Sequence, residues 1–428
     1  MSEEEVTSTS KRRLGVLAAL LVVVGGVLIV ALLLSPQSAD EASPGAAATA
    51  PETADSGWIQ AGMDVEVDGR IRLDIGATVL AISGDGATVA IRHLSSNDDL
   101  PDGRNVDVFR WRDSDWEPLG ATVTNDGAGG VSVALSADGN TMVLGDPNGG
   151  NAEDARPTVR VLRWNGDSWG RLGDELGLPS NETTFGRVVA ISDDGNTVAF
   201  NESQLGPTER TERQVFSHRW DGRAWNPLGS DIVIEDANSN IQSIALSGDG
   251  STLVAVTGRR VAHIYRWSGA AWVQLGQPLS RDRFRSGWVF SGALSEDGET
   301  VLLSGLRSST QGPGGIVAVF RWENETWTQV GESLEGGSFT SFGASADISA
   351  DGNTVAASSY VTEGEDTYGL VEVFTFDGTS WTQIGERIPA QDIFLAHIAL
   401  SDSAGRIVIS GRIETDPTDG RLRAFDFR

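Results

Sequence analysis

From residue 58 to residue 428 the chain alternates between apolar and polar positions in short runs, and turn-forming residues separate these runs. Residues 348–356, which read Ile-Ser-Ala-Asp-Gly-Asn-Thr-Val-Ala, show the pattern in its clearest form. Alternation with a period of two predicts β-strands. An Asp-Gly pair between two such runs predicts a tight hairpin, because glycine adopts the turn conformation that branched residues disfavour. We call the two strands of this hairpin A and B.

The hairpin is repeated along the chain. Copies begin at Ile82, Leu135, Ile191, Leu246, Leu294 and Ile348, and a looser copy begins at Leu400, with turn glycines at positions 86, 139, 195, 250, 298, 352 and 405. A second pattern lies between successive copies and predicts two further strands, C and D; residues 317–331, Val-Ala-Val-Phe-Arg-Trp-Glu-Asn-Glu-Thr-Trp-Thr-Gln-Val-Gly, are an example. A repeated four-stranded unit of about fifty residues is typical of a β-propeller blade.

The two ends of the repeat region complement each other. The sequence contains seven A–B hairpins but only six complete C–D pairs. Residues 421–428 resemble a C strand that no D strand follows, and residues 57–65 resemble a D strand that no C strand precedes. Pairing these ends would complete a seventh blade from three C-terminal strands and one N-terminal strand, and it would leave no open edge. The sequence therefore predicts an all-β fold, a closed seven-bladed propeller over residues 57–428.

The segment before the propeller has a different composition. Leu14–Leu34 is a run of 21 residues without a charge, which is long enough to span a bilayer as a transmembrane helix. A cleaved signal peptide is the alternative, but its apolar region is usually only about 7–15 residues long. Three cationic residues, 11–13, precede the run, which predicts a cytoplasmic tail at residues 1–13 and export of the propeller to the cell surface or periplasm. Residues 35–56 are rich in Ala, Ser, Pro and acids and are predicted to form a disordered linker.

Charge and composition narrow the range of functions. The formal net charge of -28 repels phosphate backbones and argues against nucleic acid as a partner. The chain has no cysteine, and each of its four histidines stands alone in its segment. Neither residue type therefore indicates a catalytic residue, a metal ligand or a cofactor site.

Two repeated residue types have both a structural and a functional interpretation. An Asp stands beside six of the seven turn glycines, at residues 85, 138, 194, 249, 297 and 351, and could ligate calcium. A calcium loop needs several oxygen ligands at alternate positions, so a single Asp fits turn chemistry better. Twelve of the 13 Trp residues lie in the C–D pattern and could stack on carbohydrate. Their recurrence at one position in every unit favours packing between blades instead.

Several short motifs resemble those of a known family. Phe-Gly pairs occur at residues 185–186 and 342–343, and Gly-x-Val-x-Val-Phe occurs at residues 315–320 and 369–374. Together they resemble FG-GAP repeats, the units of integrin α-chain-like seven-bladed propellers, and the Ser-x-Asp-Gly-x-Thr segment also resembles WD40 and TolB-type blades. The resemblance covers residues 58–428 and implies an adhesion or interaction module. The Asp-x-Asp-x-Asp-Gly calcium loop of FG-GAP repeats is missing, so the resemblance does not extend to calcium binding.

One group of cations stands out on the predicted ring. With strand A innermost, the A–B and C–D turns emerge on one face, and the B–C and D–A loops emerge on the other. Two loops of the fourth unit should bring five arginines together on the second face, next to the one Trp outside the repeat; this candidate patch is Arg259, Arg260, Arg281, Arg283, Arg285 and Trp288. Guanidinium groups bind carboxylates and sulfates through paired hydrogen bonds. The alternative is pairing with the many Asp and Glu residues of the same chain.

These observations predict a single-pass, membrane-anchored, extracytoplasmic propeller. Its expected role is that of a non-enzymatic binding, adhesion or protein-interaction module for a protein or glycan ligand. A hydrolase or lyase acting on carbohydrate is one alternative, and it would need convergent acids at the central channel. A scaffold for the assembly of envelope proteins is another alternative. No catalytic residue, metal or cofactor is assigned.

Overall fold

The fold is given by a computed structural model that describes residues 21–24, 27–30, 57–67, 71, 79–94, 104–124, 132–147, 157–177, 183–204, 213–235, 240–258, 261–280, 288–307, 314–337, 340–363, 366–390, 393–413 and 420–428. Contacts divide the chain into two units, Met1–Glu52 and Thr53–Arg428. In the first unit β1 (Leu21–Val24) and β2 (Val27–Val30) form an antiparallel pair.

Both strands of the first unit fall within the predicted membrane span Leu14–Leu34. Among the described residues, none belongs to a helix with the length and apolar character that a membrane crossing requires. The rest of the span, the tail at residues 1–13 and the linker at residues 35–56 lie outside the described residues. The transmembrane helix therefore stays a prediction.

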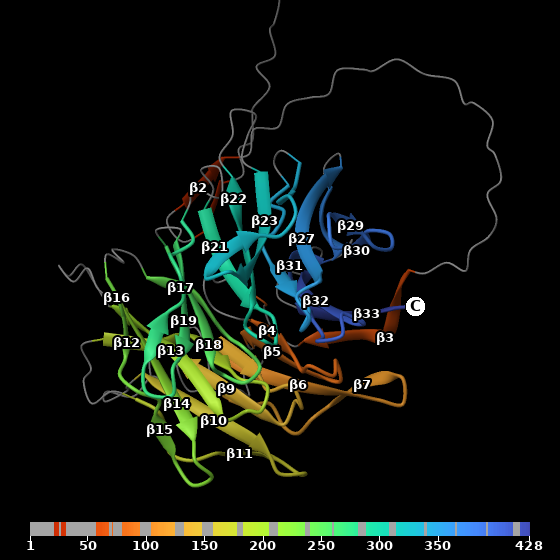
Figure 1. The fold of residues 1–428 in the computed structure, drawn as a ribbon. Coiled ribbons are helices and arrows are strands. Elements are labelled where there is room, and N and C mark those ends of the chain that lie inside the picture. The colour runs from red at the N-terminus through yellow and green to blue at the C-terminus, as the bar shows by residue number, and fades with distance from the viewer. Residues whose placement is uncertain are drawn as a thin grey trace, which may run out of the picture. The chain divides into compact units, whose positions relative to one another are not determined.

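The second unit consists of seven antiparallel sheets, one for each blade (Figure 1). In blade 1 the strands are β4 (Leu80–Ile82), β5 (Thr88–Leu94), β6 (Arg104–Arg112) and β7 (Asp115–Pro118), and in blade 2 they are β8 (Ser132–Leu135), β9 (Thr141–Asp146), β10 (Thr158–Trp164) and β11 (Trp169–Arg171). Blade 3 contains β12 (Thr183–Ile191), β13 (Thr197–Gln204), β14 (Arg213–Trp220) and β15 (Trp225–Pro227), with β16 (Ile232–Ile234) also paired to β14. Blade 4 contains β17 (Ile241–Leu246), β18 (Thr252–Thr257), β19 (Val261–Trp267) and β20 (Trp272–Gln274).

The remaining three blades follow the same order from strand A to strand D. Blade 5 contains β21 (Trp288–Leu294), β22 (Thr300–Arg307), β23 (Gly314–Glu323) and β24 (Thr326–Gln329), with β25 (Leu334–Glu335) paired to β23. Blade 6 contains β26 (Ala346–Ile348), β27 (Thr354–Glu363), β28 (Asp366–Phe376) and β29 (Trp381–Gln383), with β30 (Ile388–Ala390) paired to β28. Blade 7 contains β31 (Ile393–Leu400), β32 (Arg406–Ile413), β33 (Gly420–Phe427) and, as its outermost strand, β3 (Trp58–Val67).

The two ends of the propeller close the ring as the sequence predicts. Strand β3 runs antiparallel to β33, with Trp58 opposite Phe427 and Val67 opposite Gly420. The first strand of each blade contacts the first strand of the next blade, and the circle is completed by contact between β31 of blade 7 and β4 of blade 1. The prediction of seven four-stranded blades with an N-terminal strand in the last blade is confirmed.

The hydrophobic core of the described propeller lies between the blades. It consists of seven clusters, and each cluster joins the facing sides of two neighbouring blades. Between blades 1 and 7, for example, Val89, Ile91 and Phe109 pack against Val408 and Leu422. Full burial of one such side chain contributes roughly 1.5–3 kcal/mol. Both faces of each blade are covered in this way, so the inner strands are apolar on both sides.

The hairpin turn of blade 7 differs from the sequence prediction by one residue. The sequence predicts Gly405 as the turn glycine, but Ala404 adopts the left-handed conformation with φ 54°. The backbone N–H of Ala404 donates to Ser401 O at 2.8 Å, as the N–H of Gly86 donates to Ser83 O in blade 1 at 2.9 Å. The prediction was wrong because Ser-Ala replaces Asp-Gly in this repeat, and the nearby glycine is shifted by one position.

Candidate functional site

In six of the seven blades an Asp side chain holds the A–B turn together. In blade 2 the Ser136 hydroxyl donates to Asp138 Oδ1 at 2.6 Å, and the backbone N–H of Asn140 donates to the same oxygen at 2.9 Å. Burial opposes ionisation of Asp138, but these hydrogen bonds outweigh it and lower the pKa of the carboxyl. The Ser–Asp bond recurs in five other blades, where the donors are Ser83, Ser192, Ser247, Ser295 and Ser349. The prediction that these Asp residues are turn residues is confirmed.

An arginine of strand C connects four of the blades to the next one, through Arg110, Arg219, Arg266 and Arg321. In blade 1, Arg110 Nε donates to Thr88 Oγ1 at 3.0 Å. Its Nη2 donates across to blade 2, to Gly139 O at 3.0 Å and to Asn140 Oδ1 at 2.9 Å. The arginines at the same place in blades 2 to 5 also donate to a threonine of their own blade; they are Arg163, Arg219, Arg266 and Arg321. Between blades 7 and 1 the connection is made by Arg406 of strand B.

The repeated Trp residues pack between blades rather than project as a binding row. Trp225 of blade 3 donates through Nε1 to Leu172 O of blade 2 at 2.8 Å, and its ring lies 5.4 Å from that of Trp220. A Cβ added to Gly173 would lie 2.8 Å from the Trp220 ring, so the glycine permits this close approach. The same bond to the preceding blade is made by Trp169, Trp327 and Trp381. The prediction of packing between blades is confirmed.

The residue after the turn serine is bonded to the same position in the next blade. The bonds run from Ala137 N to Asp193 O, Asp193 N to Gly248 O, Gly248 N to Glu296 O, Glu296 N to Ala350 O, Ala350 N to Asp402 O and Asp402 N to Gly84 O, at 2.8–3.0 Å. Between blades 1 and 2 a longer contact of 3.5 Å joins Asp85 N to Ala137 O. These contacts form a circle around the central opening of the ring. We call the circle the mouth; its members are Gly84, Ala137, Asp193, Gly248, Glu296, Ala350 and Asp402.

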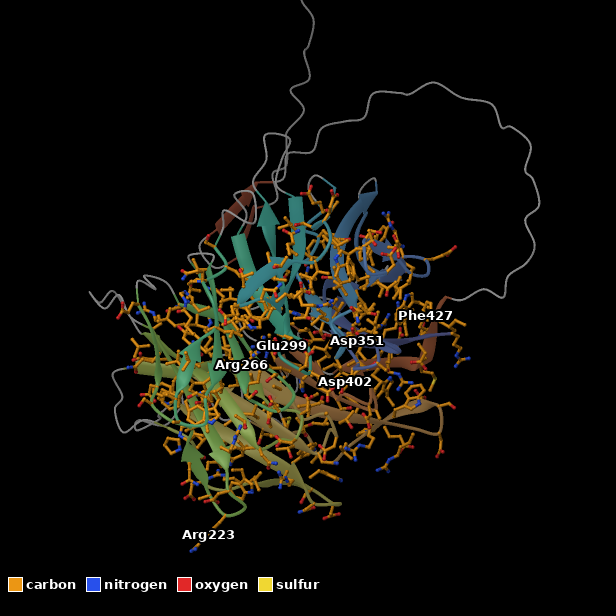
Figure 2. The ribbon with its side chains drawn as sticks, in the orientation of Figure 1. Arg223, Arg266, Glu299, Asp351, Asp402 and Phe427 are labelled. Atoms are coloured by element: carbon orange, nitrogen blue, oxygen red, sulfur yellow. The ribbon has the colours of Figure 1, made fainter. Side chains whose placement is uncertain are left out.

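Three members of the mouth carry a carboxylate, and we call Asp193, Glu296 and Asp402 the mouth carboxylates. A Cβ added to Gly84 would lie 1.9 Å from Asp402 Oδ2, and one added to Gly248 would lie 2.2 Å from Asp193 Oδ2. The glycines therefore leave the space that the acids of neighbouring blades occupy. Asp402 lies in the central region where the blades meet (Figure 2).

Two of the mouth carboxylates, Asp193 and Asp402, have raised pKa values. Burial and the charges of Asp402 and Glu296 raise the pKa of Asp193 to about 6. Burial and the charge of Glu296 also raise the pKa of Asp402. A depression of about 690 Å³ at the mouth has further acids in its lining, namely Asp249, Asp297 and Asp351. Negative charge is thus concentrated at one end of the central channel, where it attracts positively charged groups.

Strand A of blade 6 contains another acid that departs from the repeat. Two residues before the turn serine the other six blades have alanine, whereas blade 6 has Asp347. Its Oδ1 accepts from the backbone N–H of Ile348 and its Oδ2 from that of Leu400 in blade 7, each at 2.9 Å. Burial nevertheless raises the pKa of Asp347 to about 6, and the charge of Asp402 acts in the same direction. The charge of Asp402 therefore links Asp347 to one of the mouth carboxylates.

The arginine patch predicted from the sequence falls outside the described residues. This applies to Arg259, Arg260, Arg281, Arg283 and Arg285, and although Trp288 begins β21, its side chain is not described. The patch therefore stays a prediction. Within the described ranges, no group of three or more His, Asp or Glu residues is placed to hold a metal ion.

Sequence reasoning missed the mouth carboxylates and Asp347. They could have been found by aligning the seven hairpins and asking which positions differ between copies. The residue after the serine is Gly, Ala, Asp or Glu, while the serine before it is constant. Such a position is free of the repeated structural role and can carry a residue for another purpose.

Comparison with known proteins identifies the fold. No protein-family model matches the chain, and no curated protein matches it either. Among solved structures 1160 chains match, so the fold is shared by many proteins and does not select an activity. One of them, a chain in the crystal structure of a mitotic checkpoint complex, is similar over 91% of this chain and 98% of its own length, with a TM-score of 0.57 and 14% identity. At this identity the similarity concerns the fold alone, and the resemblance to FG-GAP repeats is not confirmed by a family match.

Proposed function

We propose that the chain is a single-pass membrane protein that displays its propeller outside the cytoplasm as a non-enzymatic binding module for a protein or glycan. The observation that carries the proposal is the contrast between repeated and non-repeated polar residues. The repeated ones, such as Asp138 and Arg110, stabilise turns and bond blade to blade, which makes the ring rigid. The mouth carboxylates and Asp347 depart from the repeat and gather at the channel. A rigid scaffold with variable residues at one place is the usual basis of a recognition surface.

The point at which the N-terminal segment joins the propeller supports display to a partner. The chain leads into β3, the outermost strand of blade 7, and Gly57 exchanges backbone hydrogen bonds with Arg428 at 2.8 and 3.0 Å. The described propeller therefore begins in an outermost strand of a blade and not in a strand that lines the centre of the ring. The acidic mouth lies on the face of the A–B turns, and the sequence predicts that the arginine patch lies on the opposite face. The propeller would then offer surfaces of opposite charge.

The binding proposal is tested with the propeller, residues 57–428, probed on arrays of acidic, neutral and basic glycans and peptides. One variant replaces the five arginines of the patch with Gln, and a matched variant replaces the mouth carboxylates with Asn and Gln. We expect acidic probes to lose at least tenfold affinity in the arginine variant only, and basic probes in the mouth variant only. Absence of binding by the unmodified propeller, or binding that neither variant changes, would contradict the proposal. If the partner is an envelope protein, the same binding would make the propeller a scaffold for envelope assembly, and the same assay tests it.

The membrane topology is tested separately with the full chain in intact cells. An epitope tag placed after Arg428 should be digested by protease added outside the cytoplasmic membrane. The N-terminal tail at residues 1–13 should remain protected until the membrane is disrupted. Protection of the C-terminal tag in intact cells would contradict an extracytoplasmic propeller.

A carbohydrate hydrolase or lyase is the second candidate, and one observation favours it. The pKa of Asp193 is about 6, and this carboxyl lies in an electrostatically coupled group with Glu296 and Asp402. A protonated acid beside ionised carboxylates is the arrangement that glycoside cleavage uses. The test is product release from a panel of oligosaccharides at pH 5–7. Turnover that Asp193→Asn removes would favour an enzyme, and no product from any substrate is the result that the binding proposal expects.

A further inference from the structure

Strand β3 has two tasks, because it completes blade 7 and it also connects the propeller to the N-terminal segment. We propose that β3 is a tension-sensitive strap: when the N-terminal segment is pulled, β3 leaves the ring before any other strand and opens the boundary between blades 7 and 1. The inference rests on the proposed membrane anchor, which supplies the pull when a partner is bound to the ring.

The strap is the one outer strand of the described propeller that no short turn joins to its neighbour. In the other six blades strand D follows strand C through a tight turn, as β24 follows β23 after only two residues. In blade 7 the partner of β3 is β33, and the two strands come from opposite ends of the propeller. Non-covalent contacts alone therefore hold β3 to β33.

These contacts form two groups along the strand. The first group lies at Trp58, where the chain enters β3 from the N-terminal segment, which we call the tether. There Gly57 and Arg428 exchange two backbone hydrogen bonds, and the Trp58 ring lies 5.1 Å from the Phe427 ring. Trp58 Nε1 also donates to Ile384 O of blade 6 at 3.3 Å. This group resists the first movement of the strap.

The second group is ionic and lies further along the strand. Arg423 donates to both oxygens of Asp64, with Nε–Oδ1 2.7 Å and Nη2–Oδ2 2.5 Å. Arg421 Nε lies 3.6 Å from Asp64 Oδ2, and Arg421 Nη2 lies 3.5 Å from Glu66 Oε1. A paired guanidinium–carboxylate contact with little solvent exposure is stronger than an ordinary surface ion pair. The accessible fractions of the Arg423 and Asp64 side chains are 14% and 23%, so the contact is partly shielded.

The direction of the pull decides how these contacts break. The tether enters β3 at Trp58, at one end of the antiparallel pair with β33. A pull directed outward from the rim crosses the strand, so the contacts separate one after another from this end. Contacts that break one after another separate at a lower force than contacts that must all break at once.

Removal of the strap also uncovers blade 1. Gly62 lies so close to Trp111 that a Cβ there would be 2.8 Å from the indole ring, and Met63 N donates to Asp115 Oδ1 at 3.1 Å. These contacts cross from blade 7 to blade 1, and they are lost with β3. The boundary between these two blades is therefore the first to open.

The test is single-molecule force spectroscopy on the full chain, pulled between its N-terminus and a peptide handle inserted at residue 222. That turn has open space around Gly222, and its neighbour Arg223 projects from the periphery (Figure 2). The chain lacks cysteine, so Ile59→Cys with Asp426→Cys introduces one pair, at positions that face each other across the two strands beside the end where the pull enters β3. We expect an early step of about 35 Å, from the ten residues of β3, before the main unfolding. Oxidation of the cysteine pair should remove this step and retain the main unfolding.

Two single variants separate the strap from a general loss of stability. Asp64→Asn should lower the force of the early step without changing the main unfolding. The control Glu175→Gln breaks an exposed ion pair with Arg171 in blade 2 and should change neither event. The proposal is overturned if no early step occurs, if the step survives oxidation, or if Asp64→Asn leaves its force unchanged. The handle replaces the membrane, so this result does not depend on whether the anchor and binding proposals succeed.

Discussion

Asp347, the acid of blade 6 that departs from the repeat, gives the sharpest prediction about stability. Asp347→Asn should stabilise the propeller above pH 6. Burial raises the pKa of Asp347 from 3.8 to about 6, so the folded protein carries this charge at a cost at neutral pH. Because the folded pKa is above the unfolded value, the contribution of this carboxyl to stability is fully present below pH 3.8 and is lost as the pH rises through 6.

The size of the effect follows from the pKa difference and the hydrogen bonds. A difference of about two pKa units corresponds to about 3 kcal/mol at pH 8. Asn has one acceptor oxygen, whereas the two oxygens of Asp347 accept from Ile348 and Leu400, so the variant loses about 1 kcal/mol of hydrogen bonding. The variant should therefore be more stable than the parent by about 2 kcal/mol at pH 8 and less stable by about 0.5 kcal/mol at pH 4, where the unfolded carboxyl is already partly ionised.

The assay is urea unfolding of the propeller between pH 4 and pH 8, followed by Trp fluorescence. Glu117→Gln, which removes an exposed acid of blade 1, is the matched control and should change stability little at any pH. A difference between Asp347→Asn and the parent that is equal at pH 4 and pH 8 would refute the reasoning. So would a variant that is less stable than the parent throughout this range.

Three further substitutions test the turns and the blade contacts. Ala404→Gly should raise the free energy of unfolding by about 1 kcal/mol, because glycine adopts the left-handed conformation of this residue without steric cost; urea titration measures it. Trp225→Phe should lower the free energy of unfolding by about 1 kcal/mol, because the hydrogen bond from Trp225 Nε1 to Leu172 O is lost. An unchanged circular dichroism spectrum would show that the fold persists. Gly84→Ala should lower the melting temperature, and Asp402→Ala in the same chain should restore most of the loss, because the added methyl group collides with that carboxylate. Additive effects of the last two changes would contradict the proposed collision.

The closed ring could be predicted because its determinants are repeated in the sequence. Seven copies of one hairpin fix the number of blades, and each copy carries its own turn residues. The unmatched ends at residues 57–65 and 421–428 fix the closure, since each lacks the partner that the other supplies. Local patterns suffice here because each blade has the same strand order and contacts its neighbours in the same way.

The candidate site could not be predicted in the same way. Asp193, Glu296 and Asp402 are separated by about a hundred residues each, and only closure of the ring brings them to one opening. The raised pKa values of Asp193 and Asp402 depend mainly on burial, which a sequence pattern does not contain. Ala404 illustrates a smaller failure, because hydrogen bonds to Ser401 form the turn of blade 7 without the expected Asp-Gly pair.

The most direct test of the fold and of everything built on it is disulfide formation between Glu66→Cys and Arg421→Cys in the otherwise cysteine-free chain. The two positions are paired across β3 and β33, and paired residues in antiparallel strands lie about 4.5–5.5 Å apart at Cα, within the range of a disulfide. A ring closed by its own ends predicts nearly complete intramolecular disulfide under mild oxidation, seen on a non-reducing gel as a monomer of altered mobility. Free thiols after oxidation, or disulfides only between copies, would contradict that closure.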